Sequence, residues 1–177
     1  FDPCAAFQCT LTIAAGATVE VAMLLGEAES ETRARALVAE FSGLPAIAQA
    51  LVYVRHFWCD LLGSVQIETP SPALDLMMNG WLTYQNLACR VWGRSAYYQS
   101  GGAFGFRDQL QDSVALLYHD AKLTRAQILL HASHQFVEGD VMPWWHPPPR
   151  MGIRTRFPHY RLWLHSITPI HIARTGA

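Results

Sequence analysis

The alternation of apolar and polar residues changes character once along the chain, near residue 26. Before this point, residues 10–13 and 18–25 alternate with a period of two, and the small residues 14–17 lie between them. A period of two is typical of β-strands, and small residues favour a turn. Residues 9–25 are therefore predicted to form a β-hairpin, which needs further strands beside it because an isolated hairpin is only marginally stable in water.

After this point the apolar residues recur with helical spacing. A first helix is predicted from the acidic run at 27–31 to Phe41, since negative charge stabilises a helix N-terminus. A second helix is predicted from Pro45 to Gly63, and an extended passage follows at 64–69.

The longest helical pattern begins with Ser71 as N-cap and Pro72 in the first turn, and it ends near Trp92. Its apolar residues keep i, i+3 and i+4 spacing over about five turns, which predicts a well-buried helix. Gln85 lies on the apolar stripe, so its amide either is hydrogen-bonded within the core, as we expect, or lines a cavity.

Two shorter helices are predicted after a glycine-rich segment. One extends from Phe106 to about Asp120, and the other opens at Thr124, where the sequence Thr-Arg-Ala-Gln has the form of a capping box. The short connection makes an antiparallel pair the expected arrangement. The second helix is predicted to bury Ile128, Leu129, Ala132 and Phe136.

Residues 138–158 show no periodicity and carry the sequence Trp-Trp-His-Pro-Pro-Pro at 144–149. Long ordered segments of this kind often have a function. Adjacent tryptophans beside a histidine suit sugar recognition, because the C–H groups of a pyranose ring stack on indole while its hydroxyls need polar partners. The alternative is a proline-rich loop that only closes one end of the domain.

The composition is that of a soluble globular domain. The 177 residues are 51% hydrophobic with a net charge of -1, which argues against nucleic acid or an anionic membrane as a partner. No apolar run reaches the roughly 20 residues of a membrane span. The cysteines form no CxxC pair, which favours reduced thiols in a cytoplasm; they are Cys4, Cys9, Cys59 and Cys89.

The densest candidate chemistry lies at residues 97–112, where a glycine-rich loop leads into a helix. Gly101, Gly102 and Gly105 allow backbone to approach a ligand closely. A helix start presents unpaired N–H groups, so Arg107 beside it would help to hold an anion, and Asp108 can accept hydrogen bonds from hydroxyls. The alternative is an ordinary turn before a helix, without a ligand.

Three other kinds of site are not predicted. His131, His134 and Glu138 are spaced as on one helix face, but no HExxH, CxxC or EF-hand pattern accompanies them, so a metal site is not expected. The glycine-rich loop lacks the Lys-Ser or Lys-Thr of a P-loop. The G-x-S-x-G motif of serine hydrolases is absent.

Four segments resemble the cellobiose and chitobiose phosphorylase family of inverting glycoside phosphorylases, glycoside hydrolase family 94. They are residues 79–90, 98–112, 136–140 and 144–148. Within this family the chain is most similar to the phosphorylase-like C-terminal region of bacterial cyclic β-1,2-glucan synthases and to related oligoglucan phosphorylases. The resemblance implies a mixed, mostly α fold.

Three parts are expected from the resemblance. Residues 1–26 would be the last strands of a β-sandwich, residues 27–69 a helical linker, and residues 70–177 the first helices of an (α/α)6 barrel. The chain does not begin with Met and a helical pattern is still developing at its end, so we expect a fragment. The resemblance also implies a cytoplasmic location, or a larger inner-membrane protein whose corresponding domain faces the cytoplasm, and leaves a homodimer open.

In this family phosphate attacks the anomeric carbon of a β-linked glucosyl unit while one carboxylic acid protonates the leaving oxygen. The resemblance implies that Arg107 binds phosphate, for which a guanidinium is suited, and that Asp108 binds hydroxyls of the glucosyl unit. It implies β-glucan oligosaccharides and phosphate as ligands, with no cofactor and no metal. Weaker candidates for lining the sugar site are Gln99, Trp144, Trp145 and His146.

The chain departs from the family in two ways. In the family the general acid lies in an Asp-Trp-Asn-Asp motif further downstream, which does not occur in this sequence, so no catalytic residue is assigned here and the chain alone is expected to be inactive. Residues 157–165 replace an acidic Ser-Asp-Asp segment of relatives. Two alternatives to a β-1,2-glucan phosphorylase therefore stay open: a noncatalytic saccharide-binding or scaffold module, and an (α/α)6 hydrolase, which needs a second carboxylate to activate water.

Overall fold

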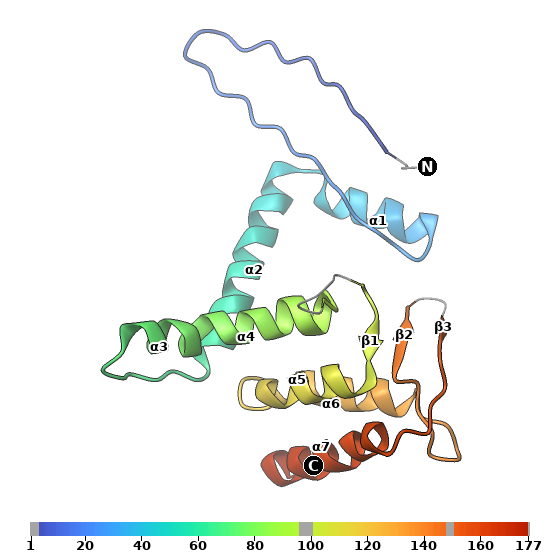
Figure 1. Ribbon diagram of the computed structural model, residues 1–177. Coiled ribbons are helices and arrows are strands. Elements are labelled where there is room, and N and C mark those ends of the chain that lie inside the picture. Colours follow the sequence, from blue (N-terminus) through green and yellow to red (C-terminus); the bar gives the residue numbers. More distant parts are fainter. Residues whose placement is uncertain (1–3, 96–100, 148–150, 177) are drawn as a thin grey trace. The chain divides into compact units, whose positions relative to one another are not determined.

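The computed structural model describes residues 4–95, 101–147 and 151–176, and it divides into two compact units, Phe1–Val54 and Arg55–Ala177 (Figure 1). The described part is mostly helical, with one small antiparallel sheet. This agrees with the predicted mixed, mostly α fold.

The first unit contains an extended segment followed by helix α1 (Glu31–Phe41) and the first part of α2 (Leu44–Gly63). The Ser30 side chain caps α1 by accepting a hydrogen bond from the Arg33 backbone N–H at 3.2 Å. The helix therefore begins at Glu31, the last residue of the acidic run in which its start was predicted. Helix α2 matches its predicted limits closely.

The strands predicted within residues 9–25 are not formed, whereas the turn predicted between them is present. The Ala17 N–H donates to the Ala14 carbonyl at 3.0 Å, and Gly16 has a positive φ of 76°. Figure 1 shows the chain leaving and returning around this turn, but the described residues of this segment form no strand. Both arms are exposed, and a hairpin without further strands is only marginally stable in water.

The long helix predicted from Ser71 is present and runs without a break from Pro72 to Trp92. It consists of α3 (Pro72–Leu76), a π-helical stretch η1 (Met77–Trp81), α4 (Leu82–Gln85) and a second π-helical stretch η2 (Asn86–Trp92). Ser71 caps it by accepting a hydrogen bond from the Leu74 N–H. The sequence had given no indication of the π-helical stretches, in which the turns are wider.

The expectation that this helix is well buried is wrong. Only Leu87 and Val91 are buried, where the helix meets the end of α2 and helix α5 (Phe106–Leu116). Gln85 is partly exposed and lines a cavity, and its carbonyl accepts a weak hydrogen bond from the Cys89 thiol. Large apolar side chains that stay exposed include Leu74, Leu76, Trp81, Leu82 and Trp92.

The main core lies among α5, α6 (Ala121–Ala132) and α7 (Pro158–Thr175), which pack against one another (Figure 1). Helix α6 begins earlier than the capping-box motif indicated, because the Asp120 side chain caps it by accepting from the Lys122 N–H at 2.9 Å. Thr124 is instead buried in the helix, and its hydroxyl donates to the Ser113 carbonyl at 2.7 Å.

The buried face of α6 also differs from the predicted one. Ile128 is buried as expected, but Leu129 is half exposed and Ala132 is exposed, while His131 is fully buried. Phe136 lies beyond the helix and is partly buried. The core residues shared by these helices and the sheet are Phe106, Leu110, Ile128, Val141, Trp145 and Ile167.

The small sheet was not predicted. It contains β1 (Phe104–Gly105), β2 (Trp144–His146) and β3 (Met151–Gly152) in the antiparallel order β1-β2-β3. Strands of two or three residues are too short to produce a recognisable period, so 138–158 looked aperiodic. A Cβ at position 152 would collide with the Trp144 carbonyl oxygen, which explains the glycine there.

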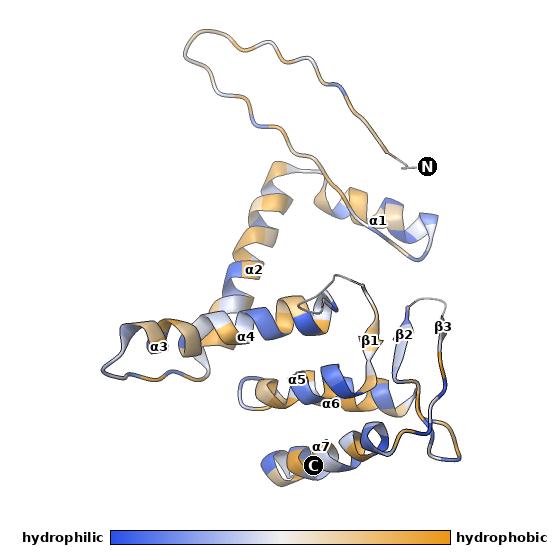
Figure 2. Ribbon diagram, in the orientation of Figure 1, coloured by the Kyte–Doolittle hydropathy of each residue, from blue (hydrophilic) through white to orange (hydrophobic). Residues whose placement is uncertain are grey.

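Apolar residues are frequent along the first half of α2 and in the long helix (Figure 2). Among the described residues, no single helix has the length and apolar character needed to cross a membrane. Helices α1 and α2 together meet that criterion only as a pair bent by 94° at the break between them.

Candidate functional site

A cavity of about 370 Å³ lies where the glycine-rich segment, β1, the start of α5 and β2 meet the beginning of α7. Its polar lining comes from two arginines, Asp108, Gln109, His146 and Tyr160. It lies within the second unit, and it contains several of the residues that the sequence singled out.

Asp108 lines this cavity from the first turn of α5. The helix begins here because the Phe106 N–H donates to the Pro143 carbonyl at 2.8 Å, which links α5 to the chain just before β2. A Cβ on Gly105 would lie 2.9 Å from Asp108 Oδ2, so glycine gives the carboxylate room beside the backbone. The Gly105 N–H donates to Gln109 Oε1 at 2.5 Å and helps to fix this turn.

Arg107 does not line the same cavity. Its side chain is exposed, its guanidinium lies 5.5 Å from the centre of the Trp163 ring on α7, and its Nε is 3.4 Å from Gln111 Oε1. Consecutive residues on a helix point about 100° apart, since a turn takes 3.6 residues. The structure therefore brings Asp108 to the cavity and directs Arg107 to a neighbouring surface.

The two tryptophans of β2 have different environments because side chains alternate across a strand. Trp144 is 41% exposed and lines the cavity with His146, whose ring lies edge-on to it at 5.4 Å between centres. Trp145 is only 1% exposed and stacks on Phe104 and His134.

The predicted role of Trp145 in lining the sugar site is therefore corrected: its ring belongs to the core. A strand at 144–146 would have indicated this alternation, but the segment was expected to be a loop. Gln99, the remaining predicted residue, lies outside the described residues.

Two arginines of the cavity were not singled out from the sequence. Arg94 has a φ of 50°, which is unusual for a residue with a side chain, and its Nε donates to the Gly102 carbonyl at 2.7 Å. Its guanidinium lies 5.0 Å from the centre of the Phe104 ring. Arg90 is held by an ion pair from its Nε to Asp112 Oδ2 at 2.8 Å. The sequence feature that could have pointed to these two arginines is their spacing of four residues, directly before the glycine-rich loop.

His131 lies on α6 with its ring beside β1. Its Nδ1 is 2.7 Å from the Gln127 carbonyl oxygen and its Nε2 is 3.3 Å from the Gly105 carbonyl oxygen. Burial lowers the pKa of His131 from 6.5 to about 4, although the two carbonyls oppose the change. The ring is therefore neutral at physiological pH.

The side chains considered for a metal site do not converge. The Nδ1 of His134 lies 2.9 Å from the Leu130 carbonyl oxygen, and Glu138 forms an ion pair with Arg154 at 2.9 Å. Across residues 4–95, 101–147 and 151–176, no group of three or more His, Cys, Asp or Glu side chains is arranged to hold a metal ion.

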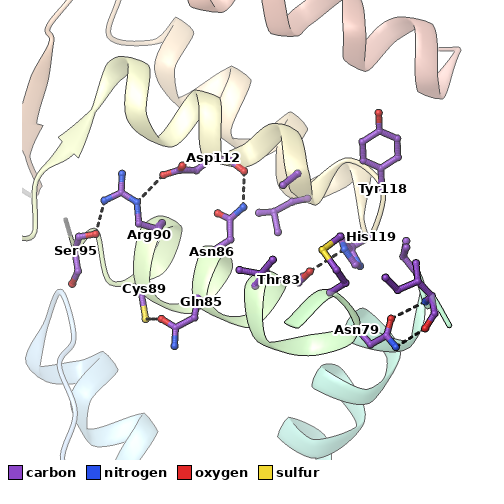
Figure 3. Close-up of a pocket in the computed structure, with 16 residues that line it drawn as sticks. Asn79, Thr83, Gln85, Asn86, Cys89, Arg90, Ser95, Asp112, Tyr118 and His119 are labelled. Carbon is purple, nitrogen blue, oxygen red and sulfur yellow. Dashed lines mark hydrogen bonds and ion pairs between the residues drawn. The ribbon is translucent and has the colours of Figure 1, made fainter. Parts of the chain in front are cut away.

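A second cavity, of about 840 Å³, lies between the long helix and α5 (Figure 3). Its polar groups mostly bind one another: Asn86 Nδ2 donates to the Asp112 carbonyl at 2.7 Å, and Thr83 Oγ1 lies 3.0 Å from His119 Nε2. Burial raises the pKa of Asp112, while Arg90 opposes the change. This cavity contains none of the predicted site residues, so the smaller one is the better candidate.

Comparison with known proteins gives two family matches. The model of the glycosyl hydrolase 94 superfamily catalytic domain matches residues 57–172, and that of the glycosyl hydrolase 94 supersandwich domain matches residues 1–44. Cyclic beta-(1,2)-glucan synthase NdvB of Rhizobium meliloti is 45% identical over 175 residues, which are 99% of this chain and 6% of that protein.

Two enzymes are more distantly similar. The N,N'-diacetylchitobiose phosphorylases of Vibrio furnissii and Vibrio proteolyticus are each 26% identical over 132 residues, which are 73% of this chain and 16% of each enzyme. The chain therefore spans only a small part of the length of the curated relatives that it matches.

Proposed function

The chain belongs to the glycosyl hydrolase 94 superfamily, and from this membership we propose that it supplies the sugar- and phosphate-binding part of an inverting glycoside phosphorylase that acts on β-linked glucans. Phosphorylases of this family use inorganic phosphate as co-substrate and need no cofactor. The similarity to a cyclic beta-(1,2)-glucan synthase supports β-1,2-linked glucose as the substrate. A cytoplasmic location, a homodimer and the barrel architecture remain predictions.

The observation that carries the proposal is the lining of the 370 Å³ cavity, which suits one sugar ring. The Asp108 carboxylate can accept hydrogen bonds from two sugar hydroxyls, and His146 can add a further hydrogen bond. The half-exposed indole of Trp144 offers a face to the C–H groups of a pyranose. Carboxylate, indole and imidazole are thus presented to one small space.

For phosphate we retain Arg107 as a proposed ligand and add Arg94. Arg107 is exposed next to the cavity, and Arg94 lies in its lining. A guanidinium can form two parallel hydrogen bonds with a phosphate. In the proposed reaction a phosphate oxygen attacks the anomeric carbon, the glycosidic C–O bond breaks with inversion, and the leaving oxygen receives a proton from a general acid.

A second candidate is a noncatalytic saccharide-binding module. Both candidates require sugar binding by this chain. They differ in turnover, because only a phosphorylase releases a glucosyl phosphate. We propose that this chain binds its ligands and that the proton donor is not among its residues.

We predict that Asp108→Asn weakens binding of a β-1,2-linked glucose disaccharide at least tenfold. A hydrogen bond to a charged group contributes about 1.5–3 kcal/mol, and tenfold in affinity corresponds to about 1.4 kcal/mol. Isothermal titration calorimetry with saturating inorganic phosphate measures the change. Asp60→Asn, on an exposed part of α2 that does not line the cavity, is the matched control.

In the same titrations Arg107→Ala is expected to reduce the extent to which phosphate strengthens disaccharide binding, while leaving the binding of the disaccharide alone within about twofold. If Asp108→Asn binds the disaccharide as tightly as the unmodified chain, the proposed sugar site is wrong. If Arg107→Ala keeps the full effect of phosphate, Arg107 has no role in binding the anion.

A further inference from the structure

Asp140 is a buried carboxylate surrounded by three arginines. It is 1% exposed, and it lies between the turn after α6 and the bridging residue Val141. Its Oδ2 accepts hydrogen bonds from Arg154 Nε at 2.8 Å and from Arg156 Nε at 3.3 Å. Its Oδ1 accepts from an Nη of Arg161.

The ionised form of Asp140 is the stable one in this environment. Burial by itself would raise the pKa of the carboxyl, but the hydrogen bond and charge of Arg154, together with Arg156 and Arg161, outweigh it and hold the pKa below its usual value. Asp140 is the buried member of the cluster, while the side chains of Arg154, Arg156 and Arg161 are 40%, 83% and 35% exposed, so removing the charge of Asp140 breaks all three ion pairs at once. The contact also raises the pKa of Arg154.

The three arginines belong to two segments, of which one lines the cavity through Tyr160 and the other follows a strand that pairs with the cavity strand β2. Arg154 and Arg156 follow β3, which pairs with β2, and Arg161 lies in the first turn of α7 directly after the cavity residue Tyr160. Val141, next to Asp140, pairs with Thr155: the two N–H···O distances are 3.3 and 2.9 Å.

A single carboxylate therefore joins the chain before β2, the chain after β3 and the start of α7. Of the cavity residues, Trp144 and His146 lie on β2, between the first two of these segments, and Tyr160 lies at the start of α7. Glu138 contacts only Arg154 among these arginines, and its side chain is 66% exposed, so it has a smaller part in the same cluster.

We propose that Asp140 is a positioning residue for the cavity, and that its ion pairs with Arg154, Arg156 and Arg161 hold β2 and the start of α7 at the spacing a sugar ring requires. The proposal rests on the proposed function, because it assigns the wall to sugar binding. Asp140 does not itself line the cavity, so its effect on a ligand passes through the residues of the wall.

The test uses Asp140→Asn, which keeps the shape of the side chain and removes its charge, with Glu138→Gln as the control. Hydrogen exchange of the β2 backbone amides is measured without a ligand, at a temperature where circular dichroism shows both variants folded. We expect protection of these amides to fall at least tenfold in Asp140→Asn and to stay within about twofold in Glu138→Gln, while the amides in the middle of α6 keep their protection.

The second measurement is calorimetric binding of the β-1,2-linked glucose disaccharide. Asp140→Asn is expected to weaken binding about tenfold in the unmodified chain and by much less when Trp144 is already alanine, because the two changes act on the same wall. Unchanged β2 protection in Asp140→Asn, or equal effects with and without Trp144, overturns the positioning role. An unmodified chain that does not bind the disaccharide overturns the proposed function instead.

Discussion

Trp145→Ala is expected to destabilise the chain by about 3–5 kcal/mol, whereas Trp144→Ala is expected to leave its stability within about 1 kcal/mol and to weaken disaccharide binding. Trp145 is 1% exposed, and its ring lies 4.0 Å from His134 and 5.2 Å from Phe104 between ring centres. Alanine would leave a large cavity at the junction of the sheet, α5 and α6. Trp144 is 41% exposed, so its removal opens little space in the core.

Urea denaturation followed by far-UV circular dichroism measures both variants on one scale. Natural domains are commonly stable by about 5–15 kcal/mol, so Trp145→Ala should lose a large share of the total or fail to fold. A Trp145→Ala variant as stable as the unmodified chain would show that this ring is not part of the core. A Trp144→Ala variant that keeps full affinity for the disaccharide would remove Trp144 from the sugar site.

The chain is expected to lose about 2 kcal/mol of stability when the pH falls from 7.5 to 5, through His131 alone. The pKa of His131 is about 4 in the folded state and 6.5 without the fold. Between these values the unfolded chain binds more protons, so stability rises with pH in this window. The contribution is complete above pH 6.5, at about 3 kcal/mol, and is lost as the pH approaches 4.

Urea denaturation of the unmodified chain and of His131→Gln at pH 7.5 and 5 tests this dependence. The glutamine variant should be less stable at pH 7.5 and should show a much flatter profile. The lowered pKa of Asp140 affects stability only at lower pH, because the contribution of this carboxylate to stability is lost as the pH falls below about 3.9. NMR titration of the His131 ring gives an independent value, and a pKa near 6.5 would contradict the buried, neutral ring.

The sequence predicted those helices whose ends carry their own chemistry. Ser71 and Pro72 set the start of the long helix, and α5 begins at Phe106, directly after Gly105, as predicted. The capping box at Thr124 failed because Asp120 supplies a cap first, which places Thr124 inside the helix. A local motif shows that a helix can begin at a residue, but competing caps nearby decide where it does begin.

Burial was harder to predict because it depends on which surfaces meet. The long helix has a regular apolar stripe, yet the rest of the described chain covers only part of it around Leu87 and Val91. His131 is polar, but it is fully buried as a neutral ring, whose single N–H can donate to one of the two carbonyl groups beside it. A pattern along one element does not contain this information about its neighbours.

The site at the glycine-rich loop stays a prediction, but the structure shows which of its residues lie at a cavity. The glycine-rich loop and Asp108 do lie at a cavity, as the residue types indicated. The resemblance suggested roles for Arg107 and Trp145, but orientation is set by helix and strand geometry, which directs one side chain to a neighbouring surface and the other into the core. Arg94 became a candidate only when the fold placed it in the cavity.

The most direct test of the proposed function is a crystal structure of this chain grown with inorganic phosphate and a β-1,2-linked glucose disaccharide. The account predicts one glucosyl ring in the 370 Å³ cavity, with a hydroxyl within hydrogen-bond distance of Asp108, the ring against Trp144, and phosphate bound by Arg107 or Arg94. A disaccharide bound elsewhere, or an empty cavity at a saturating concentration of both ligands, would contradict it.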